Sequence, residues 1–493
     1  MSWLLALSFG CGDSASPGGG GAGGDGGSVG GAPMGGDDLG GAGGSGGEAS
    51  SWTSGTGHFA PTWQAAIRCT SNQVGSRVGR HFIGKEGDVW LGGTLDGACD
   101  AFGAATTEEA GTHVFATRLA GSTGAPVFSR AFAQGDAIFG FGLVGLSGGL
   151  KMAGGFDAPV MFDALPAVDP PALPDHTPAW PTFIVDLDAA GAASGVRSLG
   201  VEYTAATLAV NESGRLAVAT GSYESDFGDG FVTVPLGAAG VAVLNADNSV
   251  RWQTVVTPAP GLTSMFFGHR VAISSDGSVL LTGVLRGELS IGGFDLSSPT
   301  TLSPTLLAFD PDGAVRGARV LPASEDWCEL DAAALSDGGF VVSQVCSGTV
   351  EAEASGVLGS AGQTSAFVLR LNQDGAVDWG RALGTSGVDS IVVNESANGG
   401  VVLGGSFLDT IDLGDGAMAS AGRRDLFLAE LDASGETSWS QRMGGEWDEG
   451  IDSISQLPSG DLVVSSNSLL GPDPTPEEPG FILEAFSRLH AQP

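Results

Sequence analysis

Polar turns with a glycine alternate along this chain with short apolar runs, and the alternation repeats seven times. Each turn is followed by four or five mostly apolar residues, as in 279–283 and 401–405, and several of these runs end in glycine. The turn glycines recur every 60–65 residues: Gly87, Gly149, Gly214, Gly277, Gly339, Gly400 and Gly460. A steady period of this length predicts a repeat architecture.

A second apolar run lies between consecutive turns and keeps the same period. It ends near a leucine followed by Asp or Asn, then a turn, and in three repeats a tryptophan: Trp252, Trp379 and Trp439. These runs predict four short strands per repeat. No segment between residues 60 and 490 combines helical apolar spacing with caps. The pattern therefore predicts an all-β, seven-bladed β-propeller of four-stranded blades, since radial closure protects the sheet edges.

The two ends of the repeat array predict how the ring closes. Residues 63–68 match the tryptophan strand of later repeats, whereas residues 481–484 match the strand that precedes it. Each end lacks what the other supplies. We therefore expect residues 63–68 to pair antiparallel with residues 481–486, as the outermost strand of the seventh blade.

Composition separates the N-terminal part of the chain from the propeller, which we place at 58–490. Residues 11–57 are rich in glycine and nearly free of apolar side chains, which predicts a disordered tether. Residues 1–10 are a short apolar stretch before Cys11. This arrangement resembles a bacterial lipoprotein signal, which implies cleavage before Cys11 and its acylation. The glycine after Cys11 implies, by the same resemblance, the outer membrane.

The other four cysteines suit an exported protein with disulfides. Cys328 and Cys346 flank a predicted hairpin, and counting back from its turn pairs residue 329 with 346, so the two thiols come within one residue of facing each other. Cys69 ends the first strand and Cys99 follows the third, so a bond there would join the closing strand to blade one. We expect both disulfides, with free buried thiols as the alternative.

The charge is strongly acidic, with 56 Asp and Glu against 20 Lys and Arg and a net charge of −36. Such a chain is unsuited to binding nucleic acid or anionic lipid through charge. Divalent cations or a basic partner are compatible, and solubility of an exported protein is the simpler explanation. We expect a monomer that meets the membrane only through its N-terminal lipid.

The chain has no zinc-protease, C-x-x-C or Walker motif, and we discount its G-x-S-x-G match at 145–149 because it falls in a predicted hairpin of a glycine-rich chain. Candidate chemistry therefore rests on position within the repeat. If the strand before each turn glycine is innermost, the residues eight positions earlier lie at one height around the axis. Three of them are ionisable: His269, Asp331 and Asp452. Together they would bind a cation or act as acid and base at the channel mouth. The alternative is that they are solvated rim residues.

The longest internal loop, between residues 155 and 182, is the second candidate. Its acidic residues recur every six positions and are followed by a histidine: Asp157, Asp163, Asp169, Asp175 and His176. Long loops on a rigid scaffold commonly bind ligands. The alternative is a proline-rich solvated excursion. The segments 310–313 and 372–375 resemble pieces of calcium loops, but we interpret them first as turns.

Residues 427–445 and 367–384 resemble the beta-propeller repeat of bacterial surface proteins (the SBBP repeat), with the tryptophan strand followed by glycine. The resemblance extends loosely over 63–490. It implies a propeller on an exported, often lipid-anchored protein, and it implies no catalytic residues.

These observations lead to one functional expectation and two alternatives. We expect a lipid-anchored, non-catalytic binding or scaffold module at the cell surface, with an unidentified protein or glycan as ligand and no cofactor. The first alternative is a polysaccharide lyase or glycosidase with its site at the channel mouth. The second is an adhesin stabilised by Ca²⁺.

Overall fold

The structure, a computed structural model, describes 23 stretches of the chain. They are residues 59–69, 77–78, 81–84, 86–96, 99–102, 105–106, 112–135, 138–146, 148–156, 159–169, 180–202, 207–220, 223–227, 231–235, 237–260, 264–321, 328–347, 351–352, 356–357, 364–383, 387–445, 448–469 and 481–491. Met1–Gly47 separates from Glu48–Pro493 as a unit of its own. The predicted signal, Cys11 and the whole predicted tether lie outside the described residues.

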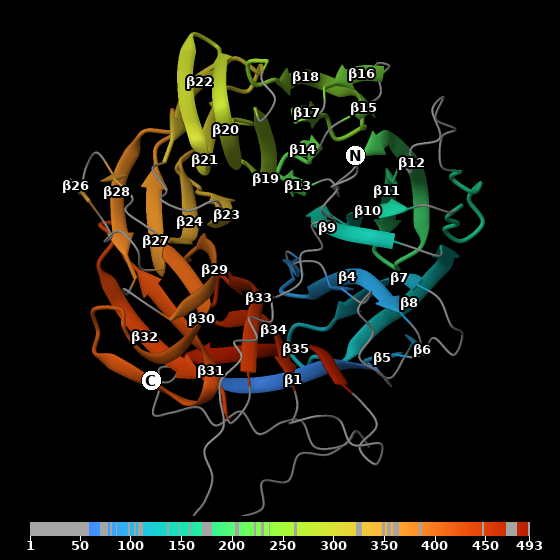
Figure 1. Cartoon of the computed structure of the whole chain (residues 1–493). Coiled ribbons are helices and arrows are strands. Elements are labelled where there is room, and N and C mark those ends of the chain that lie inside the picture. The colour runs from blue at the N-terminus through green and yellow to red at the C-terminus, as the bar shows by residue number, and fades with distance from the viewer. Residues whose placement is uncertain are drawn as a thin grey trace, which may run out of the picture. The chain divides into compact units, whose positions relative to one another are not determined.

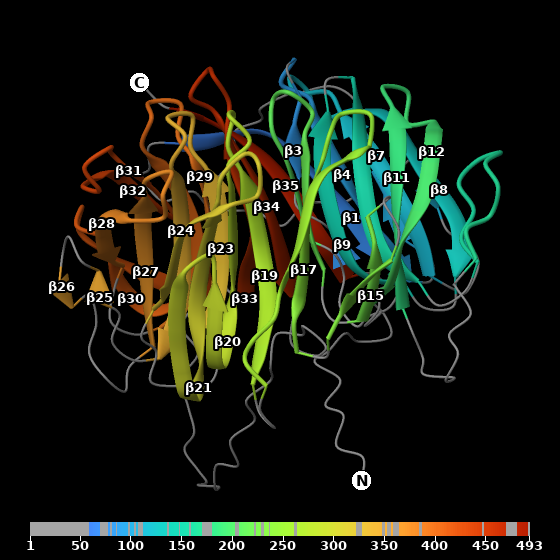
Figure 2. The ribbon, with the colours of Figure 1, turned by 90° about the horizontal axis from the view of Figure 1, so that it is seen from above.

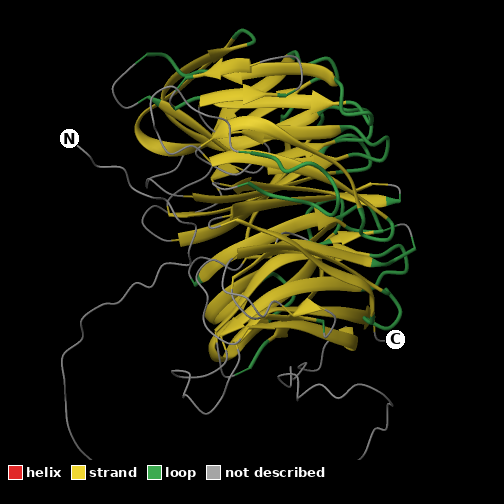
Figure 3. Ribbon diagram, turned by 90° about the vertical axis from the view of Figure 1, so that its right-hand side faces the viewer, coloured by secondary structure: helices red, strands yellow, loops and turns green. Residues whose placement is uncertain are grey.

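The described residues form strands and turns with no helix, arranged as the predicted seven-bladed β-propeller (Figures 1 and 3). Blades one to three contain these strands in order: β2 (Arg77–Val78) with β3 (Phe82–Ile83), β4 (Val89–Asp96), β7 (Thr112–Leu119) and β8 (Pro126–Gly135); β9 (Ile138–Leu146), β10 (Gly149–Phe156), β11 (Trp180–Asp188) and β12 (Ala193–Glu202); β13 (Thr207–Val210), β14 (Leu216–Thr220), β17 (Ala239–Leu244) and β18 (Val250–Val256).

Blades four to six repeat the same antiparallel order without a break. Their strands are β19 (Met265–Ile273), β20 (Val279–Ile291), β21 (Phe294–Phe309) and β22 (Val315–Val320); β23 (Cys328–Ala334), β24 (Phe340–Ser347), β27 (Thr364–Leu371) and β28 (Val377–Ala382); β29 (Val388–Glu395), β30 (Val401–Asp412), β31 (Ala417–Leu431) and β32 (Thr437–Met443). The first strands of successive blades contact one another, as β19, β23 and β29 do in Figure 2, so they are innermost.

Both ends of the chain build blade seven. β33 (Asp448–Gln456), β34 (Leu462–Leu469) and β35 (Phe481–Ala491) come from the C-terminus, and β1 (Phe59–Cys69) comes from the other end. β1 runs antiparallel to β35, with Ala65 opposite Phe486, and the two lie side by side in Figure 1. The predicted closure is confirmed, and it is longer than predicted because the pairing extends to Phe59 opposite Ala491.

Short strands from the loops extend two blades outward. β5 (Cys99–Ala101) and β6 (Ala105–Thr106) leave blade one, and β5 pairs with the end of β1, placing Cys99 opposite Cys69. β15 (Tyr223–Asp226) and β16 (Phe231–Val234) leave blade three, and β15 pairs with β12 of blade two. A last hairpin joins β25 (Glu351–Ala352) to β26 (Gly356–Val357). β1 is therefore not the free edge of blade seven along its whole length.

The structure corrects which glycine makes the turn in three repeats. Gly148, Gly338 and Gly399 have positive φ, at 94°, 90° and 75°, whereas the predicted Gly149, Gly339 and Gly400 do not. In blade five the Leu335 carbonyl accepts the amide of Gly338, which forces that residue into the left-handed region that glycine tolerates. Measured on the true turn glycines, blades four to seven repeat every 61 residues, at 277, 338, 399 and 460.

The predicted disulfide between Cys328 and Cys346 is present. It lies in blade five, where the two residues face each other directly with a Cα–Cα distance of 4.6 Å. The predicted register was wrong by one residue, because Ala334, not Leu335, is the last residue paired with Phe340. Cys99 is disulfide-bonded and faces Cys69 in the strand register, as expected for the second bond.

Aromatic rings on the outer strands join neighbouring blades. In four blades a ring covers the glycine in the outer turn of the next blade, so close that an added Cβ would lie 2.3–2.9 Å from it. The pairs are Trp63 on Gly124, Phe128 on Gly191, Trp252 on Gly313 and Trp379 on Gly435. Trp63 and Trp379 also donate their indole N–H to carbonyls of the same turns. The recurring tryptophan is thus a contact between blades.

Candidate functional site

The three channel-mouth candidates occupy different positions in the strand register. His269 in β19 and Asp452 in β33 are extra residues at β-bulges, where the register skips from 268 to 270 and from 451 to 453. Asp331 in β23 is in regular register and is 3% exposed. Blades five and six separate the blades of His269 and Asp452. Counting residues back from each turn glycine could not detect the bulges, because such a count assumes that every residue of one strand pairs with one residue of the next.

The bulge at His269 places Arg270, which the sequence analysis missed, at the level of Asp331. Arg270 and Asp331 are each the fourth paired residue before their turns, opposite Thr282 and Ser343. The Arg270 Nε lies 3.7 Å from Asp331 Oδ1. Burial, with a smaller effect of the Arg270 charge, lowers the pKa of His269 to about 4. Its imidazole is therefore neutral near pH 7.

Asp331 is engaged by the neighbouring blade. Its Oδ2 accepts the backbone N–H of Val393 in blade six at 3.0 Å, and its Oδ1 accepts the N–H of Ala332 at 2.7 Å. Ser453 makes the equivalent bond between blades seven and one, because its hydroxyl accepts the N–H of His81 at 3.3 Å. The same hydroxyl lies 2.6 Å from His81 Nδ1. These two inner polar side chains hold adjacent blades together.

Two asparagines, Asn211 just after inner strand β13 and Asn394 in inner strand β29, also join neighbouring blades. Asn211 donates to the Ser274 carbonyl of blade four at 3.0 Å, and Asn394 donates to the Ile454 carbonyl of blade seven at 3.2 Å. The turn carboxylates and amides are also occupied, since Asp310 Oδ1 and Asn372 Oδ1 each accept two backbone amides of their own turns. The segments that resemble calcium-loop fragments are therefore turns in this structure.

Only part of the blade-two loop is described. Asp157, Asp175 and His176 lie outside the described residues. Phe162 is fully buried, with its ring 5.1 Å from that of Phe183, and anchors the described part. Asp163 accepts a hydrogen bond from the Arg130 guanidinium of blade one at 3.2 Å and another from the backbone N–H of Ala193 at 2.8 Å. Asp169, in contrast, is exposed. Asp163 therefore holds the loop in place, and Asp169 is exposed to solvent.

A buried pair of carboxyl groups joins blades six and seven, and the sequence analysis missed it. Asp425 in β31 is 0% exposed and Glu449 in β33 is 6% exposed. An added Cβ on Gly444 would lie 2.6 Å from Asp425 Oδ1 and 2.9 Å from Glu449 Oε2, so both oxygens face one point. Arg442 pairs with the other oxygen of Asp425 at 2.5 Å.

This environment favours a protonated Glu449. Burial is the main cause that raises its pKa to about 8, and the Asp425 carboxylate adds to the effect. Protonation of Glu449 removes the repulsion between two buried carboxylates at the blade junction. The signal that could have found the pair is weak, because the two residues belong to different blades.

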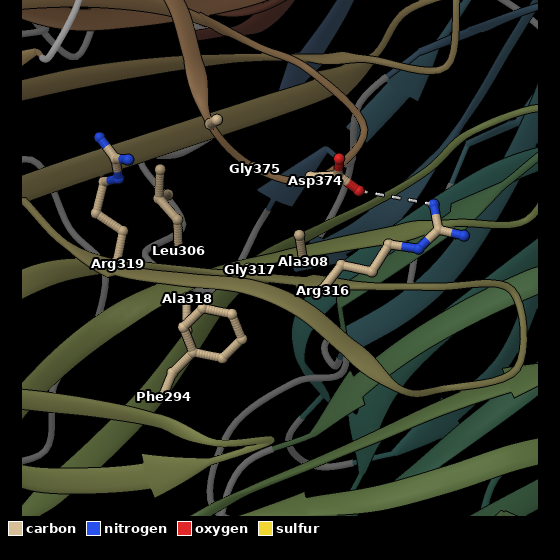
Figure 4. Close-up of a pocket in the computed structure, with 10 residues that line it drawn as sticks. Phe294, Leu306, Ala308, Arg316, Gly317, Ala318, Arg319, Asp374 and Gly375 are labelled. Atoms are coloured by element: carbon tan, nitrogen blue, oxygen red, sulfur yellow. Dashed lines mark ion pairs between the residues drawn. The ribbon is translucent and has the colours of Figure 1, made fainter.

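A pocket opens between the outer strand of blade four and the outer turn of blade five (Figure 4). Its volume is about 250 Å³. The floor is mostly apolar, and two arginines and one aspartate flank it; the lining residues are Phe294, Leu306, Ala308, Arg316, Gly317, Ala318, Arg319, Asp374, Gly375 and Ala376. In Figure 4, Arg316 points toward Asp374, and Arg319 stands at the opposite end of β22.

The pocket lies where blade four departs from the repeat. Gly317 occupies the register position of Trp252 and Trp379, opposite the third strand of its blade. Without a ring, the turn of blade five closes onto β22, and an added Cβ on Gly317 would lie 1.9 Å from the Asp374 carbonyl oxygen. The pocket is the space that remains beside this contact.

The described residues offer neither a metal site built from His, Cys, Asp or Glu side chains nor a membrane-spanning helix. No group of three or more His, Cys, Asp or Glu side chains there has an arrangement that would hold a metal ion. The same part of the chain contains no helix of a length and apolarity that would cross a membrane.

Comparison with known proteins gives only distant structural likenesses. No protein-family model and no curated protein match the chain. A Dyadobacter fermentans protein of unknown function is similar over 88% of this chain and 100% of its own, with 11% identity and a TM-score of 0.40. A quinohemoprotein alcohol dehydrogenase from Comamonas testosteroni covers 88% of this chain and 76% of its own, with 10% identity and a TM-score of 0.37.

A gluconolactonase from Xanthomonas campestris is more distant still. The likeness covers 69% of this chain and 90% of the lactonase, with 12% identity and a TM-score of 0.30. Likenesses of this extent say nothing about activity, so the function of the chain has to be argued from its own residues.

Proposed function

We propose that the chain is a non-catalytic binding or scaffold module, exported and held at a bacterial cell surface through a lipid on Cys11. The observation that carries the proposal is the use of inner-strand polar groups to join blades. Asp331, Ser453, Asn211 and Asn394 all bond to the backbone of a neighbouring blade. Side chains committed in this way stiffen a frame, and a stiff frame presents loops and rims to a ligand.

The chain's composition and its N-terminal residues support the proposed location at the cell surface. The glycine-rich segment that follows Cys11 has the composition of a flexible tether. A net charge of −36 favours a soluble body that stands away from an anionic bilayer. Metabolic labelling with a fatty acid tests the anchor. Label should enter the wild-type protein and be absent from Cys11→Ser, and equal labelling of both would contradict the anchor.

A screen of glycans and surface proteins tests the binding role. The chain from residue 58 onward, spread over a glycan and protein array, should retain at least one ligand and leave it chemically unchanged. Release of shortened saccharides during incubation would contradict a non-catalytic role.

One observation favours the enzyme alternative, a polysaccharide lyase or glycosidase. His269 has a pKa lowered to about 4, so its neutral imidazole can accept a proton, and Arg270 lies beside it in β19. The variant His269→Ala separates the two functions. Loss of saccharide cleavage in this variant would support the enzyme, and unchanged ligand retention without any cleavage would support the binding module.

A further inference from the structure

We propose that strand β1 is exchangeable between two copies of this chain, and that the disulfide at Cys99 keeps the strand in its own ring. The partner is a second, identical chain, and the interaction surface is the edge of β35 that β1 covers. The inference concerns assembly of the ring, so it does not depend on the function proposed above.

The contacts that hold β1 in blade seven are the same whether the strand comes from one chain or from another. β1 runs along β35 from Phe59 opposite Ala491 to Cys69 opposite Phe481. Gln441 binds both backbone groups of Phe59 and lies 382 positions away in the sequence. An identical copy presents the same partners, so exchange of the strand sacrifices none of these contacts.

Both halves of the junction are stabilised by pairing. β35 has β34 on one side and β1 on the other, so without β1 it would expose a row of backbone N–H and C=O groups. Phe59 and Trp63 on β1 are buried in the ring, at 4% and 8% exposed, and would be uncovered with it. A strand of the same sequence from a second copy satisfies both needs.

The connections of β1 permit a reciprocal exchange. Residues 70–76 join β1 to β2, and seven residues span at most about 25 Å. The preceding segment, 11–57, is rich in glycine. Two rings whose seventh blades lie side by side can therefore trade first strands, which gives a dimer with two-fold symmetry.

The contact with β5, in contrast, is close in sequence. Residues 67–69 pair with residues 99–101, and Cys99 is disulfide-bonded and stands opposite Cys69. These cysteines are about 30 positions apart, against 382 for Phe59 and Gln441. In an unfolded chain, the effective concentration of two segments falls roughly as the −3/2 power of their separation, so β5 meets β1 roughly 40-fold more readily than blade six does.

A bond between Cys69 and Cys99 makes this early contact permanent. Its formation joins the two Sγ atoms and transfers two electrons and two protons to a disulfide oxidant, which is reduced to two thiols. Afterwards the end of β1 cannot leave its own blade one. Residues 59–66 then pair with the β35 of the same chain, and the ring closes as a monomer.

Refolding a mixture of ¹⁴N-labelled and ¹⁵N-labelled full chains tests the proposal. Reduced chains are refolded at high or low concentration, with oxidised glutathione added at the start or only after refolding. Mass spectrometry then measures how many Cys69–Cys99 peptide pairs contain both isotopes. Late oxidant at high concentration should give at least tenfold more mixed pairs than early oxidant, and dilution should abolish them.

The matched internal control is the bond between Cys328 and Cys346, which lies within blade five and should stay unmixed in every sample. Absence of mixed Cys69–Cys99 pairs with late oxidant would overturn the exchange. Equal mixing with early and late oxidant would overturn the role of the bond, and mixed Cys328–Cys346 pairs would show general misfolding in place of strand exchange.

Three variants test the same inference by light scattering. Cys69→Ser/Cys99→Ser should form dimers whose fraction rises with concentration. Cys328→Ser/Cys346→Ser removes the other disulfide, and Gln441→Ala weakens the closing junction but keeps the bond, so both should remain monomeric. A folded, monomeric Cys69→Ser/Cys99→Ser, or dimers in all three variants, contradicts the proposal. The isotope experiment uses the wild-type chain, so it decides the question even where a variant fails to fold.

Discussion

Gln441 of blade six holds Phe59, the first residue of the closing strand, by both backbone groups. Its Oε1 accepts the Phe59 N–H at 2.8 Å, and its Nε2 donates to the Phe59 carbonyl at 3.0 Å. The Phe59 ring packs 4.8 Å from that of Trp439. The two outer strands of blade seven, β35 and β1, are not joined by a turn, because they lie far apart in the sequence. The side-chain amide of Gln441 thus replaces the contact of ring and turn glycine used elsewhere.

Replacing Gln441 with alanine should destabilise the ring. Two buried backbone groups of Phe59 would lose their partners, so the free energy of unfolding should fall by about 1–3 kcal/mol. Gln64→Ala is the control, since Gln64 lies exposed on the same strand and should change stability by less than about 0.5 kcal/mol. Urea unfolding measures both, and equal losses would contradict the role of Gln441.

Deleting residues 59–70 should cost much more stability than deleting residues 18–50. The first deletion removes the partner of β35 and exposes the apolar edge of blade seven, whereas the second shortens a glycine-rich segment. Thermal unfolding of the two deletion variants is the measurement. Equal melting temperatures would mean that β1 contributes little to closure.

Gly317→Ala and Gly195→Ala should differ although the two glycines are equivalent in the repeat. An added Cβ at 317 would lie 1.9 Å from the Asp374 carbonyl oxygen, whereas at 195 the nearest atom is Asp186 Oδ2 at 3.6 Å. We expect a loss of about 1–3 kcal/mol at 317 from overpacking, and a change within about 0.5 kcal/mol at 195. Denaturant unfolding checks this, and similar values would show that blade five simply moves away.

Glu449 should make stability depend on pH. Its pKa is raised to about 8 in the folded chain, from its ordinary value of 4.5, so folding favours the protonated form. This stabilisation is fully present below about pH 4.5 and is lost as the pH rises toward 8. The variant Glu449→Gln has a neutral side-chain amide beside Asp425 at every pH. The melting temperature of this variant should therefore fall less than that of the wild type between pH 5 and pH 8.5.

The control for this prediction is Glu288→Gln, which changes an exposed carboxylate on β20. It should leave the wild-type pH profile in place. A Glu449→Gln profile that runs parallel to the wild-type profile would show that folding does not raise the pKa of Glu449.

The disulfides are open to direct measurement. Unreduced protein should carry no alkylatable thiol at Cys328, Cys346, Cys69 or Cys99, and mass spectrometry of alkylated peptides would find any that exists. The Cys328–Cys346 bond closes an 18-residue separation, so replacing both cysteines with serine should lower stability by about 3 kcal/mol in the chain-entropy model.

The number of blades, their strand count and the closure could be predicted because they depend on local periodicity. The choice between Gly338 and Gly339 could not, since either glycine tolerates positive φ and the turn hydrogen bonds decide. The same limit applies to the inner strands. One bulge at His269 moves Arg270 to the level of Asp331, and no periodic pattern announces it.

The inter-blade pairs were beyond prediction for another reason. Asp425 and Glu449 meet only because blade six packs on blade seven, and the partner of Asp331 is a backbone amide that carries no sequence signal. The tryptophans were visible in the sequence, but their glycine partners in the next blade were not. What depended on packing between repeats had to come from the structure.

The topology of β1 also determines when during synthesis this strand can pair. Phe59 and Gln441, its partner in blade six, are 382 positions apart, and β35 is made later still. At about 5–20 residues per second, the first strand waits roughly 20–80 s for Gln441 to leave the ribosome. Throughout that interval only the end of the strand, residues 67–69, has a partner, which is β5, and residues 59–66 wait for β35. The chain therefore closes its ring only after β35 has been made.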